Sequence, residues 1–493
     1  MVTDLAVFIN LDHENRHYPL YRQIYDSIRT AILSGALRSA VRLPPSRELA
    51  AQLSVSRMTV VNAYDQLLAE GYLEGKAGSG TFVAAEIPDE YHTAPRRENT
   101  VPRRHKRRLR LSDYGEALKT QGEAIRANEA ASKLVPFQHG LPALDKFPFE
   151  IWERILAKYH RTSLRKLVSK SGPLGYEPLR IAVAEHLRSA RGVACQTDEV
   201  VITNGAQQGL DLIARILLRS GDRVWMEDPG YLGAREAFGA AGAAVMPVRS
   251  DMEGFDLNYA IKRYGSAELT YVTPSHQFPL GGAMTLARRI EVLEWADRSG
   301  AIIVEDDYDS EFRYQGRPLA SMQGLDRDGR VIYLGTFSKT LFSALRLGCM
   351  VVPSDLTDIF ATARLTSDLH SPLIEQAALA EFIRDGHFAR HVRRMRKLYA
   401  ERQEILLNAV GKYLNGVIKM NPASSGMHLV GWLPEGVSDI AFSNAAAAKG
   451  VRVAPVSDYA MRKPKRGGLL FGYAGFDERQ IAAAVGRLAE IDL

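Results

Sequence analysis

The change in hydrophobic pattern along the chain is the feature that most limits its fold. Residues 14–84 carry apolar side chains at helical spacing and end in a glycine-rich turn. From residue 135 to residue 493, short apolar runs alternate with longer helical patterns, which is typical of an α/β sheet domain. Residues 85–134 contain three prolines and little apolar periodicity, as linkers do. The sequence therefore predicts two domains, at 14–84 and 135–493, joined by a basic, proline-containing linker.

The composition excludes several classes of protein. Cys195 and Cys349 are the only cysteines, so a disulfide framework is not expected and a reducing compartment fits. Residues 1–10 lack the basic and apolar regions of a signal peptide. No run approaches the roughly 18 apolar residues of a membrane span. We therefore expect a cytoplasmic protein without a membrane partner.

The positive charge of the chain is concentrated in one strip. Residues 96–110 hold eight lysines or arginines and one glutamate, whereas the whole chain has a net charge of +6. This strip can contact a polyanion, or it can be a solvated linker, and the sequence leaves both interpretations open.

The N-terminal segment predicts a helix-turn-helix followed by a hairpin. Helices are expected over residues 21–33, 46–53 and 57–70, and the turn at Ser54-Val55-Ser56 offers hydroxyls to cap the last of them. The first turn of that last helix would enter the major groove, where Ser56, Arg57 and Thr59 reach phosphates or base edges. Strands at 71–74 and 81–83, joined by the glycine-rich residues 75–80 with Lys76, predict a wing that approaches the DNA backbone.

Three strand-to-loop segments of the larger domain carry polar groups that suit one cofactor. Strands are expected at 200–203, 301–305 and 331–334, and the glycine-containing turn after the first of them exposes free amides at a helix N-terminus. Neither a G-x-G-x-x-G nor a G-K-[ST] motif is present, so dinucleotide and P-loop sites have no support. No metal site is predicted.

The cofactor that these groups suit is pyridoxal 5'-phosphate. Lys339 would supply the amine for a Schiff base with its aldehyde, and the Asp306 carboxylate would hold the pyridine nitrogen protonated. Tyr308 would bond the 3-hydroxyl, and Tyr231 would stack on the ring. The predicted phosphate ligands are Thr336, Ser338, Arg346 and the amides of Gly205, Ala206 and Gln207.

The N-terminal motifs resemble the GntR family of winged-helix repressors. The resemblance lies in residues 43–50, 55–60, 70–73 and 78–83. It implies that double-stranded operator DNA is bound through Arg47, Arg57 and the wing glycines. The full predicted DNA-binding set is Ser46, Arg47, Ser56, Arg57, Thr59, Lys76, Gly78 and Gly80. Ala40 stands where the family usually has glycine, which indicates a changed loop entry.

The larger domain is similar to fold-type I aminotransferases, and its sequence motifs resemble those of the MocR subfamily of GntR regulators. The motifs are residues 227–231, 273–279, 305–312 and 336–341. The resemblance implies an α/β aminotransferase-like domain with a small C-terminal α/β subdomain. It also implies domain-swapped, head-to-tail homodimers with cofactor pockets at the subunit interface, and control of genes of amino-acid, amine or vitamin B6 metabolism.

Two positions depart from the aminotransferase pattern. Phe278 stands where an asparagine usually contacts the ring hydroxyl, a role that His276 or Gln277 would take over. Leu470 stands where amino-acid-responsive relatives have the arginine that grips the α-carboxylate. The effector is therefore the cofactor itself, an amine, or an acid bound by another residue.

The sequence as a whole predicts a DNA-binding transcription regulator that senses the cofactor, an amine or an amino acid through Lys339. No residue is assigned a catalytic role, although a residual half-transamination is compatible with the site. A working aminotransferase with a vestigial DNA-binding head is the alternative, against which the intact N-terminal motifs and the departures at Phe278 and Leu470 count. A regulator that has lost the cofactor is disfavoured because Lys339, Asp306 and Arg346 are all present.

Overall fold

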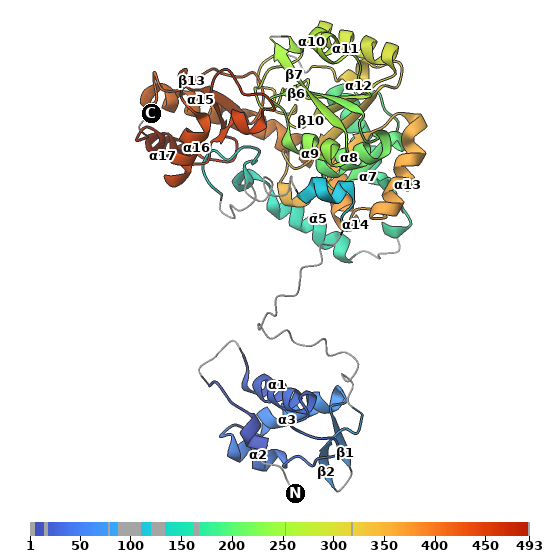
Figure 1. The fold of residues 1–493 in the computed structure, drawn as a ribbon, viewed down its shortest axis with the longest axis vertical. Helices are drawn as coiled ribbons and strands as arrows, with labels where there is room; N and C mark the ends of the chain where they lie inside the picture. Colours follow the sequence, from blue (N-terminus) through green and yellow to red (C-terminus); the bar gives the residue numbers. More distant parts are fainter. Residues whose placement is uncertain are drawn as a thin grey trace. The chain divides into compact units, whose positions relative to one another are not determined.

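The computed structural model describes residues 5–13, 18–76, 79–86, 110–119, 134–161, 167–251, 253–316 and 319–491. It divides into two compact units, Met1–Leu109 and Arg110–Leu493, each of which is described by itself (Figure 1). The predicted DNA contact at Gly78 and the basic strip up to residue 109 lie outside the described residues. So does most of the rest of the predicted linker.

The first unit is a three-helix domain with a hairpin. Its elements are η1 (Leu5–Phe8), α1 (Leu20–Leu33), α2 (Ser46–Gln52), α3 (Arg57–Ala69), β1 (Leu73–Lys76) and β2 (Gly80–Val83). The apolar faces of α1 and α3 meet in one core, in which Ile24, Ile28, Val60 and Leu67 are fully buried. Ser56 caps α3 because its hydroxyl accepts from the Thr59 amide at 3.1 Å. The helix-turn-helix is therefore formed by the residues for which the sequence predicted it.

One detail of this unit differs from the prediction, and another explains why glycine is usual at position 40 in the family. We predicted that the wing tip begins at Gly75, but β1 continues through Lys76, which pairs with Gly80. The tip is therefore shorter than expected. Ala40 has φ +61°, in the left-handed region, which is the physical reason why glycine suits this position.

The second unit is built on an eight-stranded mixed sheet. Its strand order is β5-β12-β11-β10-β9-β6-β7-β8. β11, β10, β9, β6 and β7 are parallel, whereas β12 runs antiparallel to both of its neighbours and β8 runs antiparallel to β7. The strands are β5 (Val200–Thr203), β6 (Arg223–Asp228), β7 (Ala244–Asp251), β8 (Gly254–Phe255), β9 (Leu269–Val272), β10 (Ile302–Asp307), β11 (Val331–Thr336) and β12 (Gly348–Val351).

Helices cover both faces of this sheet, so its central strands are buried and mostly apolar until they approach their carboxyl ends. One face packs against α8 (Ala206–Leu217), α9 (Leu232–Ala240) and α13 (Thr357–Ser367). The other face packs against α5 (Phe149–Arg161), α7 (Glu177–Arg191), α10 (Leu257–Tyr264), α11 (Leu286–Ser299), α12 (Met322–Leu325) and α14 (Leu373–Arg384). Figure 1 shows α5, α7 and α14 gathered at one end of the unit. A short hairpin of β3 (Ser171–Gly172) and β4 (Gly175–Tyr176) precedes α7.

β10 ends in three consecutive buried acids whose side chains alternate between the two faces. Glu305 accepts from the Met322 and Gln323 amides at 2.9 Å each. Asp307 pairs with Arg191 at 2.7 Å on that same face. Asp306, between them, points to the α8 side.

A smaller antiparallel sheet forms the C-terminal part of the unit. Its order is β13-β14-β16-β15, with β13 (Lys419–Met420), β14 (His428–Trp432), β15 (Ala454–Pro455) and β16 (Gly468–Gly472). It packs with α15 (His387–Tyr413), α16 (Asp439–Ala448) and α17 (Glu478–Leu488). The segment around Phe137 joins this sheet by a bridge to Gly472, which brings residues 137–140 beside the strand ends of the large sheet.

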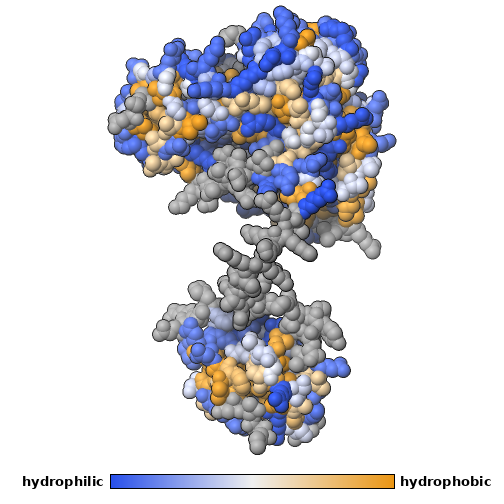
Figure 2. Space-filling model, in the orientation of Figure 1, coloured by the Kyte–Doolittle hydropathy of each residue, from blue (hydrophilic) through white to orange (hydrophobic). Residues whose placement is uncertain are grey.

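The surface of each unit is mixed in character. Figure 2 shows hydrophilic and hydrophobic residues interspersed over the visible face of both. Among the described helices, none combines the length and the apolar composition that a membrane crossing requires.

Candidate functional site

A cavity of about 220 Å³ lies where the large sheet meets the C-terminal part of the unit. Nine of the ten predicted cofactor-binding residues line it, namely Ala206, Gln207, Tyr231, Asp306, Tyr308, Thr336, Ser338, Lys339 and Arg346. The tenth, Gly205, lies directly behind Arg346, because a Cβ at this glycine would come within 3.3 Å of the guanidinium. The structure thus brings together residues that are as much as 141 positions apart in the chain.

Lys339 presents its amine to the middle of this cavity. Nζ donates to the Gly140 carbonyl oxygen at 3.2 Å, and a Cβ at residue 140 would lie 2.4 Å from Nζ. Only glycine therefore leaves room for the amine. Burial lowers the pKa of Lys339 from its ordinary value, against the opposing attraction of Asp309 and Asp306. A lowered pKa gives a larger fraction of neutral, nucleophilic amine.

The Asp306 carboxyl has one oxygen satisfied and one without a partner. Oδ2 accepts from the Tyr271 hydroxyl at 2.6 Å, whereas the buried Oδ1 has no hydrogen-bond partner. Burial raises the pKa of Asp306 to about 7, although the Tyr271 bond opposes the shift. A buried, unpaired carboxylate oxygen that faces a cavity is suited to bind a protonated ring nitrogen.

Two tyrosines stand at the sides of the cavity. Tyr231 is the residue directly before α9, and its hydroxyl donates to Gln207 Oε1 at 3.3 Å. The Tyr308 hydroxyl lies 2.9 Å from His276 Nδ1. The same ring nitrogen lies 3.0 Å from Asp309 Oδ2, so Tyr308 is held by a buried His–Asp pair. Burial raises the pKa of Tyr308 well above its ordinary value, so the hydroxyl stays protonated and remains a hydrogen-bond donor.

The opposite end of the cavity is built to hold an anion. Gly205 is the N-cap of α8, and its φ of +89° turns the chain where the helix begins, with Ala206 and Gln207 of the first turn lining the cavity. Arg346 Nη2 donates to the Asn204 carbonyl oxygen at 2.9 Å, which fixes the guanidinium beside these amides. The Thr336 hydroxyl accepts from the Ser338 amide at 3.2 Å. Free amides, hydroxyls and an arginine are the donors that a phosphate monoester requires.

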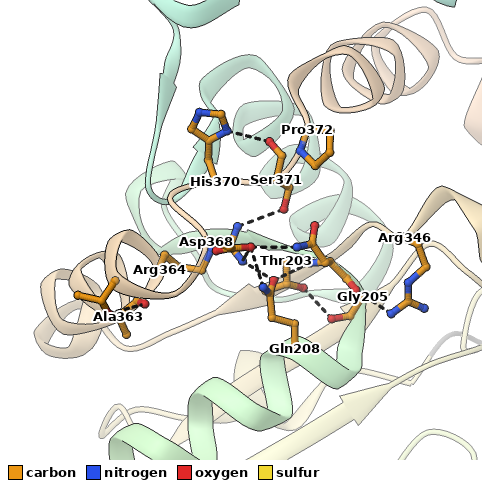
Figure 3. Close-up of polar contacts among 12 residues, drawn as sticks. Thr203, Gly205, Gln208, Arg346, Ala363, Arg364, Asp368, His370, Ser371 and Pro372 are labelled. Carbon is orange, nitrogen blue, oxygen red and sulfur yellow. Dashed lines mark hydrogen bonds and ion pairs between the residues drawn. The ribbon is translucent and has the colours of Figure 1, made fainter. Parts of the chain in front are cut away.

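A buried polar cluster behind this anion site keeps the turn in place (Figure 3). Arg364 is fully buried and forms an ion pair with Asp368 at 3.1 Å. Asp368 Oδ2 also accepts from Asn204 Nδ2 at 3.0 Å and Gln208 Nε2 at 2.9 Å, so it ties the β5–α8 turn to the end of α13. In Figure 3 Arg346 lies at the edge of the residues drawn, and its guanidinium is joined to them by the bond from Nη2 to the Asn204 carbonyl oxygen.

Several residues of the cavity were not predicted. They are His139, Gly140, Tyr271, Thr273, Phe278, Asp309, Ser343, Met427 and His428. Tyr271 belongs to a predictable apolar run, β9, and its role follows from lying next to β10. His139 and His428 carry no local signal, because they arrive through pairings of β16 with residues 137 and 428.

The two departures from the aminotransferase pattern have clear positions. Phe278 lines the cavity, whereas His276 and Gln277 do not, so neither replaces the missing asparagine by direct contact. Gln277 Nε2 instead donates to the Pro229 and Phe278 carbonyl oxygens. Leu470 is fully buried in an apolar cluster with Phe278 and Tyr459 beside the cavity.

Most of the predicted DNA contacts in the first unit are exposed where they are described. Arg47, Ser56, Arg57, Lys76 and Gly80 are exposed, and Ser46 and Thr59 are half-buried. Ser46 accepts from Arg57 Nε at 3.5 Å, which links the two helices at the point where α3 begins. Side chains from α2, the start of α3 and the wing are the ones that a winged helix-turn-helix presents to DNA.

Comparison with known proteins matches both units. The model of "Bacterial regulatory proteins, gntR family" matches residues 20–83, and that of "Aminotransferase class I and II" matches residues 147–488. The chain is 41% identical to the "Probable rhizopine catabolism regulatory protein MocR" of Rhizobium meliloti, over 95% of this chain and 93% of the relative. It is 31% identical to the "HTH-type pyridoxine biosynthesis transcriptional regulator PdxR" of Corynebacterium glutamicum, over 97% and 96%.

Solved structures of aminotransferases resemble the second unit. LysN, the α-aminoadipate aminotransferase of Thermus thermophilus complexed with a phosphopyridoxyl-leucine, aligns with a TM-score of 0.69 and 30% identity. The alignment covers 77% of this chain and 97% of that chain. The kynurenine aminotransferase of Pyrococcus horikoshii aligns with a TM-score of 0.68 and 29% identity, over 78% and 94%. The fold is that of pyridoxal-phosphate aminotransferases.

Proposed function

This chain belongs to the MocR subfamily of GntR-type transcription regulators, and we propose on that premise that the pocket around Lys339 binds pyridoxal 5'-phosphate covalently and reports its state to the DNA-binding domain. Four groups in one cavity support the proposal. They are the buried amine of Lys339, the unpaired Oδ1 of Asp306, the guanidinium of Arg346 and the free amides at the start of α8. The Asp306 Oδ1 atom supports the proposal most strongly, because a buried carboxylate oxygen without a partner is costly unless a ligand completes it.

Each of these groups has a task that its surroundings suit. The cofactor, when bound, supplies an aldehyde that reacts reversibly with primary amines. Lys339 is the protein's own amine for that aldehyde, and its lowered pKa favours the neutral form. Asp306 holds the ring nitrogen, Tyr308 donates to the ring hydroxyl, and Tyr231 covers a ring face. Arg346, Ser338, Thr336 and the amides of Gly205, Ala206 and Gln207 bind the phosphate.

The first unit supplies the output. We propose that residues 14–84 bind double-stranded operator DNA through the exposed set that includes Arg47, Arg57 and Lys76, and that residues 85–134 link them to the cofactor domain at 135–493. We further propose a domain-swapped, head-to-tail homodimer in the cytoplasm, which the subfamily membership supports. Effector binding and DNA binding are then reciprocally coupled.

A catalytic aminotransferase is the second candidate, because the solved neighbours named above are enzymes. The proposal of a regulator without steady turnover rests on Leu470, which lies in an apolar cluster at the position where amino-acid-responsive relatives have an arginine. Measured turnover of any amino donor with a keto acid would favour the enzyme.

The visible absorption spectrum of the full chain loaded with pyridoxal 5'-phosphate tests the proposal. We expect a band above about 400 nm that borohydride removes, since a covalent imine absorbs there and is reducible. Lys339→Ala should lack the band, whereas Lys397→Ala, at a lysine side chain that is 84% exposed on α15, should keep it. A protein that stays colourless, or a Lys339→Ala variant with an unchanged band, would refute the assignment.

A further inference from the structure

The end of the cavity beyond Lys339 differs sharply from the anion-binding end. His139, Phe278, Asp309, Met427 and His428 line it. Among the described residues that line the whole cavity, Lys339 and Arg346 are the only lysine and the only arginine. Arg346 lies at the anion-binding end, fixed to the Asn204 carbonyl oxygen.

The two histidines at this end are uncharged. Burial, together with neighbouring positive groups, lowers the pKa of His139 to about 3 and that of His428 to about 4. His428 Nε2 lies 2.9 Å from the Pro279 carbonyl oxygen, which can only accept, so Nε2 carries the proton and Nδ1 is left as an acceptor. His139 Nε2 lies 3.2 Å from the Tyr459 hydroxyl. A neutral imidazole can donate to or accept from a hydroxyl, but it brings no positive charge to offset that of a carboxylate.

The remaining charged group at this end is an acid. Asp309 lies 3.0 Å from His276 Nδ1, and both side chains are 1% exposed. A second carboxylate brought into this space would meet Asp309, and none of the described residues that line this end of the cavity carries a guanidinium. A buried carboxylate without a cationic partner is strongly disfavoured.

The wall on the Leu470 side is apolar. Leu470 is fully buried on β16, paired with Val430 of β14, in a cluster with Phe278, Val456 and Tyr459. Apart from the Tyr459 hydroxyl, which lies against His139, these side chains are apolar and none of them carries a charge.

We propose that the effector of this site is a primary amine that carries no carboxylate and whose hydroxyl groups are bound by His139 and His428. This inference rests on the proposed function, because the amine acts by competing with Lys339 for the cofactor aldehyde. Released from the aldehyde, Lys339 Nζ regains its bond to the Gly140 carbonyl oxygen.

Matched pairs of compounds that differ by one carboxylate test the proposal. Ethanolamine and serine form one pair, and tyramine and tyrosine form another. Each is titrated into the full chain loaded with pyridoxal 5'-phosphate while the visible band is followed. We expect each amine to shift the band at a concentration about 100-fold lower than its carboxylated partner. Equal potency, or a preference for the amino acids, would overturn the proposal.

A third outcome is distinguishable from both. If no visible band forms when the cofactor is added, the proposed function itself fails. If the band forms and responds to amino acids alone, only the inference on the effector fails. Binding of the amine to the chain without the cofactor, followed by calorimetry, should be undetectable.

Two variants separate the charge argument from the hydroxyl argument. Leu470→Arg should move the preference toward serine and tyrosine by at least about tenfold, whereas the size-matched Leu470→Met should leave it unchanged. His428→Phe should remove the advantage of ethanolamine over ethylamine and leave the tyramine-to-tyrosine ratio as it was. An unchanged ethanolamine-to-ethylamine ratio would refute the role of His428 even if Leu470→Arg does not fold.

Discussion

Replacing Asp306 by asparagine should weaken the binding of pyridoxal 5'-phosphate about tenfold at pH 8, because it removes a charge and keeps the shape. In the wild-type chain the unpaired Oδ1 is free to accept a charge-assisted hydrogen bond from a protonated ring nitrogen. Such a bond contributes about 1.5–3 kcal/mol, against about 0.5–1.5 kcal/mol for a neutral one. The difference of about 1.5 kcal/mol corresponds to roughly a tenfold change in the dissociation constant.

The same substitution should change how binding depends on pH. In the free protein, burial raises the pKa of Asp306 to about 7. A positive ring nitrogen lowers that pKa, so below pH 7 the carboxyl must release a proton when the cofactor binds. Wild-type affinity therefore gains up to about tenfold per pH unit from this group between pH 5 and pH 7. Asparagine has no proton to release, so the tenfold difference in cofactor affinity between the wild type and Asp306→Asn should nearly disappear at pH 6.

Titration of the cofactor-free protein, followed by the visible band at pH 6, 7 and 8, measures both effects. Tyr271→Phe is the matched control, since it removes the 2.6 Å bond to Oδ2 and keeps the carboxyl group. We expect this control to retain the pH dependence with its midpoint moved upward, because the hydrogen bond from Tyr271 holds the pKa of Asp306 down. An asparagine variant whose affinity equals that of the wild type at pH 8 would refute the role given to Asp306.

Four further outcomes are expected. Arg57→Ala should weaken binding to any duplex DNA and lower the slope of log affinity against log salt by about 1, as fluorescence anisotropy would measure; an unchanged slope would mean that Arg57 contacts no phosphate. Asp368→Asn should lower the free energy of unfolding in urea by about 3 kcal/mol, because it leaves Arg364 buried with no carboxylate, and a loss below about 1 kcal/mol would contradict this. Burial lowers the pKa of His391 to about 4, so the unfolded chain binds the extra proton between pH 4 and about 6.5; the free energy of unfolding should fall by about 2 kcal/mol from this group as the pH drops to 5, and His391→Gln should remove that part of the loss. Ala40→Gly should stabilise the N-terminal unit by up to about 1 kcal/mol, seen as slower hydrogen exchange in α1 and α3, because φ is +61° at this position.

The part of the pocket that lies at strand ends could be predicted from the sequence. Thr203 and Thr336 end β5 and β11, and Asp306 lies one residue before the end of β10. These strands run in the same direction, so the groups at their ends must meet at one edge of the sheet. Hydrophobic runs that stop at polar residues can be recognised in the sequence alone. For the same reason, the helices of the N-terminal unit and the cap at Ser56 could be placed within about one residue.

The other wall of the pocket had no such signal. His139 and His428 reach it because β16 pairs with residues far away along the chain, and no local pattern specifies a partner of that kind. The neutral state of these histidines depends on burial by the whole domain, which composition does not reveal. The tip of the wing was predicted to be too long. Gly75 and Lys76 have the composition of a loop, yet they belong to β1, and Lys76 pairs with Gly80.

The alternation of the three acids along β10 bears on how this family can diverge. Glu305, Asp306 and Asp307 are neighbours in sequence, yet they serve a helix start, the pocket and the Arg191 guanidinium respectively. Deleting or inserting a single residue within the strand would turn every side chain beyond it to the opposite face. Either change would leave Arg191 without its carboxylate partner and set a different acid toward the pocket. The strand can therefore exchange an apolar residue for another of similar volume, but it cannot change its length by one.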